Sequence, residues 1–293
     1  MADKRRRKRG DRKDGRLITE LDSLHFITGI LYPNRCDNEG YISECVDLTN
    51  LNAYVERKNA LNPEYHYNLF QIIVAALLKT ITLRPKMNRF IVNDNFYQRN
   101  EVSASFVVKK LFSDNGGEAL AFIHAKDDDT LETIHNEIYA QISDRKSEKS
   151  TSDASSDSMD IFNKLPRWLS KFLVHIIMWL DKFGKVPQSL IATDPYYSSC
   201  VISNLGSIKL HSGYHHLTNW GTCSMIVLIG EKKVRPFFDD DGTVHMKDSV
   251  DIGLTIDERI ADGYYYAKTM KLFRYLLENP ELLELPLSEE IEY

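Results

Sequence analysis

Apolar side chains recur every three or four residues in five stretches of the chain, and this spacing predicts amphipathic helices. The clearest stretch is 67–83, where the apolar positions fall on one side of a helix. Thr49 begins an earlier helix as its N-cap, and Pro280 ends the last one. The predicted helices are the segment after Thr49, 67–83, 131–142, 165–183 and 262–278.

Alternating apolar and polar side chains predict strands between these helices. The alternation is clearest in the last predicted strand, 244–257, where Val250, Ile252, Leu254 and Ile256 would share one face. Asp239–Gly242 has the composition of a hairpin turn before it. The other strand-like segments are 41–48, 90–123, 199–203, 225–230 and 234–238. This mixture of sheet and helices predicts an α/β sandwich in a single domain.

Two segments stand apart from this pattern. Residues 143–160 are charged and rich in serine, without apolar periodicity, and we expect a flexible loop there. The helix 165–183 is apolar on one side and carries Arg167, Lys171, Asp181 and Lys182 mostly on the other. Such a helix is compatible with a membrane surface, with a cover over a substrate channel, or with packing into the core or a subunit interface. Packing is the expectation, and membrane contact stays an alternative.

Composition describes an ordinary globular chain. Of the 293 residues, 43% are apolar and 27% are charged, which argues against a disordered or fibrous protein. No apolar run approaches the length that spans a bilayer, and no apolar core follows the basic start as in a signal peptide. Four cysteines without close spacing argue against a disulfide scaffold and against a structural zinc site. We therefore expect a cytoplasmic protein.

Charge is distributed unevenly along the chain. Nine of the 37 Lys and Arg residues lie in residues 1–16, while the rest of the chain is acidic. A basic arm of this kind can indicate nucleic acid or an anionic membrane surface. No nucleic-acid motif accompanies it, and the acidic body would repel phosphate, so no nucleic-acid partner is expected. The expectation for 1–16 is a disordered basic tail.

Two short segments have the character of motifs. Residues 200–206 read Cys-Val-Ile-Ser-Asn-Leu-Gly, and residues 257–263 read Asp-Glu-Arg-Ile-Ala-Asp-Gly. The first resembles the Ser-Asn-Leu-Gly segment of dihydrolipoyl acyltransferases, the catalytic cores of 2-oxoacid dehydrogenase complexes. The second resembles that family's Asp-His-Arg-x-x-Asp-Gly signature, and chloramphenicol acetyltransferase shares the fold. The resemblance implies an α/β two-layer sandwich with a mixed sheet, of the chloramphenicol acetyltransferase type. The similarity covers about residues 20–285, which predicts an acyltransferase-like domain over 17–285 and a C-terminal tail over 286–293.

The resemblance implies a chemistry. Such enzymes move an acyl group between coenzyme A and a thiol or hydroxyl, in a channel between the subunits of a homotrimer. Ser203 would stabilise the oxyanion, and Asp262 would hold the signature segment through Arg259. Asn204 and Gly206 would belong to the cofactor-binding segment. The resemblance assigns nearly the whole chain to one domain, so we expect no lipoyl attachment on this chain.

Position 258 departs from the signature, because Glu258 stands where the family has its catalytic histidine. A positioned general base contributes about 10²–10⁴-fold in rate, and imidazole suits this role at neutral pH. Carboxylates have an ordinary pKa near 4.3, a poorer match unless burial raises it. Glu258 continues the alternation of the strand before it, so partial burial is expected, and a contact with Arg259 would act against that effect.

Three interpretations of this departure stay open. Glu258 replaces the histidine as base, or His215 or His216 supplies the base, or the chain keeps the fold and trimer as a non-catalytic binding or scaffold protein. Ser203 and Asp262 also have structural interpretations, since Ser203 can bond within its turn and Asp262 can cap the last helix. An acyltransferase is the leading expectation.

Other chemistry has weaker support. Cys200 lacks a neighbouring histidine in sequence, and small buried cysteines are common. His211 and His215 have helical metal-ligand spacing, but Gly213 lies between them and no third ligand is evident. We expect no metal, and the absence of a glycine-rich phosphate motif argues against nucleotide hydrolysis.

Overall fold

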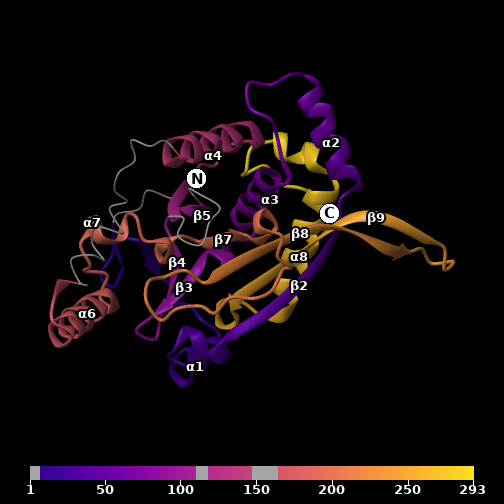
Figure 1. Ribbon diagram of the computed structural model, residues 1–293. Coiled ribbons are helices and arrows are strands. Elements are labelled where there is room, and N and C mark those ends of the chain that lie inside the picture. The colour runs from indigo at the N-terminus through magenta and orange to yellow at the C-terminus, as the bar shows by residue number, and fades with distance from the viewer. Residues whose placement is uncertain (1–6, 110–117, 147–163) are drawn as a thin grey trace.

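The computed structural model describes residues 7–109, 118–146 and 164–293 (Figure 1). Within these residues six strands form a mixed sheet in the order β2-β9-β8-β7-β5-β6. Strand β7 runs parallel to both of its neighbours, and the other neighbouring strands are antiparallel. The strands are β2 (Glu39–Asp47), β5 (Val102–Lys109), β6 (Glu118–Ala125), β7 (Cys200–Asn204), β8 (Met225–Phe238) and β9 (Val244–Asp257).

Four helices pack on one face of this sheet and enclose the core (Figure 1). They are α2 (Thr49–Ala60), α3 (Leu69–Leu83), α4 (Leu131–Lys146) and α8 (Gly263–Glu278). Helix α3 lies at the centre, with every residue from Gln71 to Ile81 buried. Its first turn is fixed by a capping box in which Asn68 and Gln71 bond reciprocally to each other's backbone. The predicted two-layer α/β sandwich with a mixed sheet is confirmed.

A second sheet of three strands adds to this plan, in the order β1-β4-β3. Its strands are β1 (Gly15–Leu17), β3 (Arg89–Val92) and β4 (Asn95–Arg99). Three further helices, α1 (Ser23–Leu31), α6 (Arg167–Lys182) and the short α7 (Gln188–Ile191), lie outside the main helical layer. Sequence pattern placed β3 and β4 within one strand-like region but did not separate them from the main sheet.

The structure contradicts the expectation of a disordered tail over 1–16 for residues 7–16, which are the part of the basic N-terminal segment that it describes. Gly15–Leu17 pairs with β4, and Arg12 is only 4% exposed. The Arg12 guanidinium bonds to Asp14 at 2.9 Å and to Asp181 at 3.1 Å, and it lies 5.6 Å from the Phe90 ring centroid. A cation between two carboxylates and an aromatic ring anchors a segment that has no apolar side chain of its own. Residues 1–6 lie outside the described residues.

The apolar helix and the serine-rich segment before it also differ from expectation. Residues 143–146 continue α4, and 147–160 lie outside the described residues. Helix α6 matches the predicted helix 165–183, but Asp181 is its one buried residue, so the helix does not pack into the core of this chain. Packing at a subunit interface stays a prediction. No helix of the described residues is long and apolar enough to span a bilayer.

Candidate functional site

A cleft of about 810 Å³ lies between α1, β2 and α8, and the signature segment forms part of its wall. This volume falls within the range of small-molecule sites, roughly 300–1,000 Å³. Glu258, Arg259, Asp262 and Gly263 line the cleft together with Ile42 of β2. The segment arrives there because β9 ends at Asp257, a single 3₁₀ turn (Glu258–Ile260) follows, and α8 begins at Gly263.

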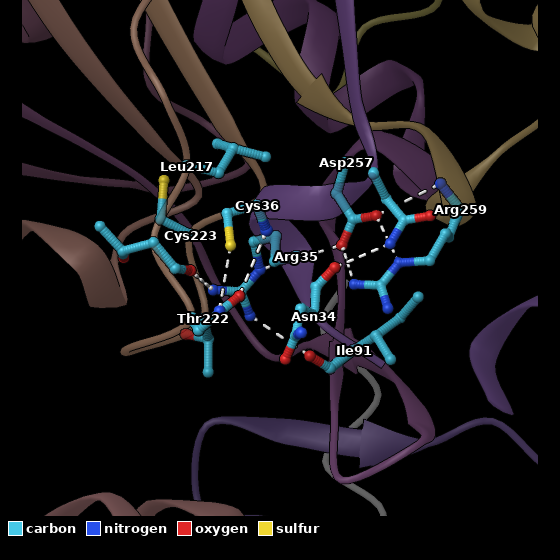
Figure 2. A network of polar contacts seen from close by, with 12 residues as sticks. Asn34, Arg35, Cys36, Ile91, Leu217, Thr222, Cys223, Asp257 and Arg259 are labelled. Atoms are coloured by element: carbon cyan, nitrogen blue, oxygen red, sulfur yellow. Dashed lines mark hydrogen bonds and ion pairs between the residues drawn. The ribbon is translucent and has the colours of Figure 1, made fainter. Parts of the chain in front are cut away.

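Asp257 is the centre of a buried ionic network beneath this wall (Figure 2). Its side chain is fully buried, and its carboxylate receives two bonds from Arg259, Nε to Oδ1 at 2.8 Å and Nη2 to Oδ2 at 2.7 Å. Arg35 Nε lies 3.8 Å from the same carboxylate. The hydroxyl of Tyr266 donates to the Asp257 carbonyl oxygen at 3.0 Å. This bidentate pairing fixes the backbone on both sides of position 258.

Arg35 extends the network to chain segments that are distant in sequence. Its guanidinium donates to the carbonyl oxygens of Thr218, Ile91 and Gly221 at 2.8, 3.2 and 3.1 Å. Burial lowers the pKa of Arg35 from its ordinary value, and the charge of Asp257 acts in the opposite direction. Sequence reasoning missed Arg35, because nothing near it in the sequence distinguishes it from a surface arginine.

Glu258 is presented to the cleft rather than buried. Its backbone N–H donates to the carbonyl oxygen of Asn38 at 2.9 Å, while its side chain is exposed. The expected partial burial is therefore wrong for the single chain. The expected contact with Arg259 is also absent from the described bonds, since Arg259 bonds to Asp257 and to the carbonyl of Tyr32. The carboxylate is accessible to a ligand in the cleft.

Asp262 acts as the N-cap of α8. Its carboxylate accepts the backbone N–H of Tyr265 at 2.9 Å, and this bond lowers the pKa of Asp262. Lys86 Nζ lies 3.8 Å from it. The expected pairing of Asp262 with Arg259 is wrong, because Asp257 is closer in the chain and already occupies the guanidinium. Capping, the structural alternative for Asp262, is the role the structure gives it.

Ser203 lies in a different part of the same chain. It belongs to β7, opposite Leu228 of β8, which pairs in turn with Gly253 of β9. Glu258 follows Gly253 by five residues, about 17 Å along an extended strand. Ile202 packs into the helical core, so alternation turns Ser203 to the other face, where Leu228 belongs to a small apolar cluster. The structure does not bring Ser203 and Glu258 together within one chain.

Asn204 and Gly206 follow Ser203 at the end of β7. Asn204 pairs with Ile229, and its carbonyl accepts a 2.7 Å bond from the Ser207 hydroxyl. A side chain at Gly206 would place its Cβ 2.6 Å from the carbonyl oxygen of Gly230. Close backbone approach therefore accounts for Gly206. The cofactor-binding role of this pair stays a prediction.

The paired histidines lie on the loop after β7 and are not among the residues that line the cleft. The His215 and His216 rings stack with centroids 4.5 Å apart, and both are exposed. The His215 backbone N–H donates to Thr255 Oγ1 at 3.3 Å. In the part of the chain that the structure describes, no three His, Cys, Asp or Glu side chains gather as metal ligands.

Sequence reasoning also missed His25, which lines the cleft from α1. Its Nδ1 lies 2.6 Å from Asp22 Oδ2, and Asp22 caps the same helix. Because a carboxylate accepts, the ring nitrogen Nδ1 donates in this contact and the imidazole is held in one orientation. The available signal was an aspartate three residues before a histidine at a helix start. An oriented imidazole and an accessible carboxylate thus share one cleft.

The four thiols differ in accessibility, which gives a direct chemical test of the fold. Cys200 and Cys223 are buried, and burial raises the pKa of both thiols, whereas Cys36 and Cys45 are exposed. We expect a thiol reagent to modify two cysteines in the native protein and four after denaturation. A Cys36→Ser, Cys45→Ser variant would then show no fast reaction. Rapid modification of Cys200 in that variant would contradict the structure and revive Cys200 as a nucleophile.

The architecture is that of the chloramphenicol acetyltransferase-like acyltransferase cores. A probable dihydrolipoamide acetyltransferase from Listeria monocytogenes 4b F2365 aligns over 94% of this chain and 97% of its own, with 15% identity and a TM-score of 0.57. The cubic core of the pyruvate dehydrogenase multienzyme complex aligns over 92% and 94%, with 14% identity and a TM-score of 0.58. A chloramphenicol acetyltransferase aligns over 90% and 98%, with 14% identity and a TM-score of 0.53.

A family match identifies the segment that carries both motifs. Residues 188–285 match the family of 2-oxoacid dehydrogenases acyltransferase (catalytic domain). The resemblance inferred from Ser203 and from the 257–263 segment is therefore confirmed. No curated protein matches the chain at a significant level.

Proposed function

We propose that this protein transfers an acyl group between coenzyme A and a thiol or hydroxyl acceptor. The observation that carries the proposal is the signature segment on the cleft wall, where the buried Asp257–Arg259 pair holds Glu258 with its side chain exposed. The matching family and the names of the aligned structures, dihydrolipoamide acetyltransferase and chloramphenicol acetyltransferase, support the same chemistry.

The site needs a second copy of the chain. Ser203 lies about 17 Å along the strand direction from the level of Glu258, and on the sheet face away from the helical core. A heterologous interface that closes as a ring would bring Ser203 of one subunit to Glu258 of the next. We propose a homotrimer of this kind.

Each residue then has a defined task. A base in the cleft removes the proton from the attacking thiol or hydroxyl, which adds to the acyl carbonyl. Ser203 Oγ donates a hydrogen bond to the oxyanion that forms, and the departing thiolate takes up a proton as the carbonyl is restored. Glu258 occupies the position of the base, and Arg259 holds it through Asp257. Asn204 and Gly206 would lie along bound coenzyme A.

One observation favours a second candidate function. Glu258 carries an exposed carboxylate where the signature has an imidazole, and a solvated carboxylate is a weak base at neutral pH. A non-catalytic relative that binds a ligand or partner in the cleft would tolerate this change. Asp257 and Asp262 would be retained there for structural reasons alone, as ion-pair partner and helix cap.

Release of coenzyme A tests the enzymatic proposal. We expect the purified protein with acetyl-CoA and dihydrolipoamide to release free coenzyme A above background, and Ser203→Ala to lower the rate by about 10²–10³-fold. Ser43→Ala, at an exposed serine of β2, is the matched control and should leave the rate unchanged. Light scattering should give three times the 33.8 kDa of one chain. Coenzyme A binding without release would favour the non-catalytic relative, and a monomer would contradict the shared site.

A further inference from the structure

The outward face of α6 carries a stripe of aromatic side chains. Trp168 is 72% exposed, Phe172 59% and Trp179 58%, and Phe183 follows directly after the helix at 47%. At 3.6 residues per turn these four positions fall within about 60° of the helix circumference. The opposite side of the helix carries apolar side chains that are half-buried: Leu169, Leu173, Ile177 and Leu180. The aromatic stripe is therefore apolar surface on the side of the helix that faces solvent.

A row of cations runs beside the stripe. Arg167, Lys171 and Lys182 fall within the adjacent sector of about 60°, and all three are exposed. Lys185 follows the helix, with its ammonium 5.9 Å from the Phe183 ring centroid. Aromatic residues next to Lys and Arg are typical of helices that lie in the interface of a lipid bilayer.

The basic N-terminal segment is fastened at the same place. Arg12 Nη2 lies 3.1 Å from Asp181 Oδ1 in the last turn of α6, and Arg12 also donates to the Asp181 carbonyl. The Tyr197 hydroxyl donates to the same carboxylate at 2.8 Å. Figure 1 shows α6 and α7 at one end of the molecule, apart from the main helical layer, with the indigo N-terminal segment beside them. The basic residues of segment 7–16 thus form a local basic region on a protein that is acidic elsewhere.

We propose that the outward face of α6, its aromatic stripe with the flanking row of cations, binds the interface of an anionic lipid bilayer. The helix lies in the membrane plane, with Trp168, Phe172 and Trp179 at the acyl boundary and the flanking cations at the headgroups. Sixteen residues span about 24 Å, too short to cross the hydrocarbon core, so the contact is peripheral. Charge complementarity favours an anionic lipid surface over pairing of two α6 faces, because the exposed basic rows of two copies would then oppose each other.

Sedimentation with vesicles tests the proposal on the full chain. We expect binding to vesicles of phosphatidylcholine with 30% phosphatidylserine, and little binding to phosphatidylcholine alone. Lys171→Ala with Lys182→Ala should weaken binding by roughly thirtyfold, from about 1 kcal/mol per cation. Trp168→Ala with Trp179→Ala should also weaken it severalfold, and brominated lipid should quench the fluorescence of these two tryptophans. Lys268→Ala on α8 and Phe238→Ala on β8 are matched exposed controls and should bind normally.

Three results would overturn the proposal. The absence of binding to the phosphatidylserine vesicles at 0.1 M salt would contradict the proposal directly. Equal retention on a soluble polyanion such as heparin, unaffected by the tryptophan substitutions, would assign the surface to polyanions instead. A fall in solution mass of the Trp168→Ala, Trp179→Ala variant without lipid would show that α6 joins copies of the chain. Circular dichroism of each variant confirms that the fold is intact.

Discussion

The Glu258→His substitution should raise the rate of coenzyme A release by about 10²–10⁴-fold over the parent chain, the contribution of a positioned general base. The backbone at this position is already fixed, because the Glu258 N–H is bound by Asn38 and the neighbouring Asp257 and Arg259 are locked together. An imidazole introduced there enters the same cleft with its pKa near neutrality. The measurement is thiol release from acetyl-CoA with dihydrolipoamide as acceptor.

Two variants distinguish the reason for a gain. Glu258→Gln keeps the volume and removes the carboxylate, so it should stay at or below the parent rate. Ser203→Ala added to Glu258→His should lose most of the gain if Ser203 of a neighbouring subunit stabilises the oxyanion. If Glu258→His and the parent chain had the same rate, this result would contradict the idea that the missing imidazole at position 258 limits catalysis. His25→Gln would then show whether the Asp22-oriented imidazole supplies it.

Local pattern was sufficient for most of the fold. The spacing in 67–83 and 262–278 predicted α3 and α8 to within two residues, because apolar side chains recur at helical spacing and each helix has its own cap at Asn68 or Asp262. The strict alternation of 244–257 likewise gave the full length of β9. Such signals lie within a single element, so a sequence alone contains them.

Signals that depend on distant partners were not predictable in this way. The sequence predicts that Arg259 pairs with Asp262, whereas its partner in the structure is Asp257. Arg35 reaches the same carboxylate from a separate segment of the chain. Arg12 looked like part of a solvated tail, because its anchor, Asp181, is remote in sequence. Charged residues give no periodic pattern when they are buried by pairing, so only the tertiary structure identifies them.

The site was predicted in part for the same reason. The motifs located the two segments that line it, but they did not show that Ser203 and Glu258 lie on different faces of the sheet in one chain. Strand register determines that separation, and register follows from long-range pairing. Burial of Glu258 was inferred from alternation that continued past the end of β9. The 3₁₀ turn at Glu258–Ile260 interrupts the alternation there and leaves the side chain exposed.

Asp257→Asn should destabilise the protein by about 3–5 kcal/mol, the cost of leaving a buried charge without its partner. Arg259 and Arg35 are 4% and 3% exposed, so neither guanidinium can recover water when the carboxylate is removed. The loss should appear as a lower midpoint in urea unfolding with an unchanged slope. Asp251→Asn is the matched control, because the Arg235–Asp251 pair is partly exposed and its loss should cost less than about 1 kcal/mol. Equal shifts for the two variants would contradict the role of Asp257 as the centre of the network. A large shift for Asp257→Asn alone would support it.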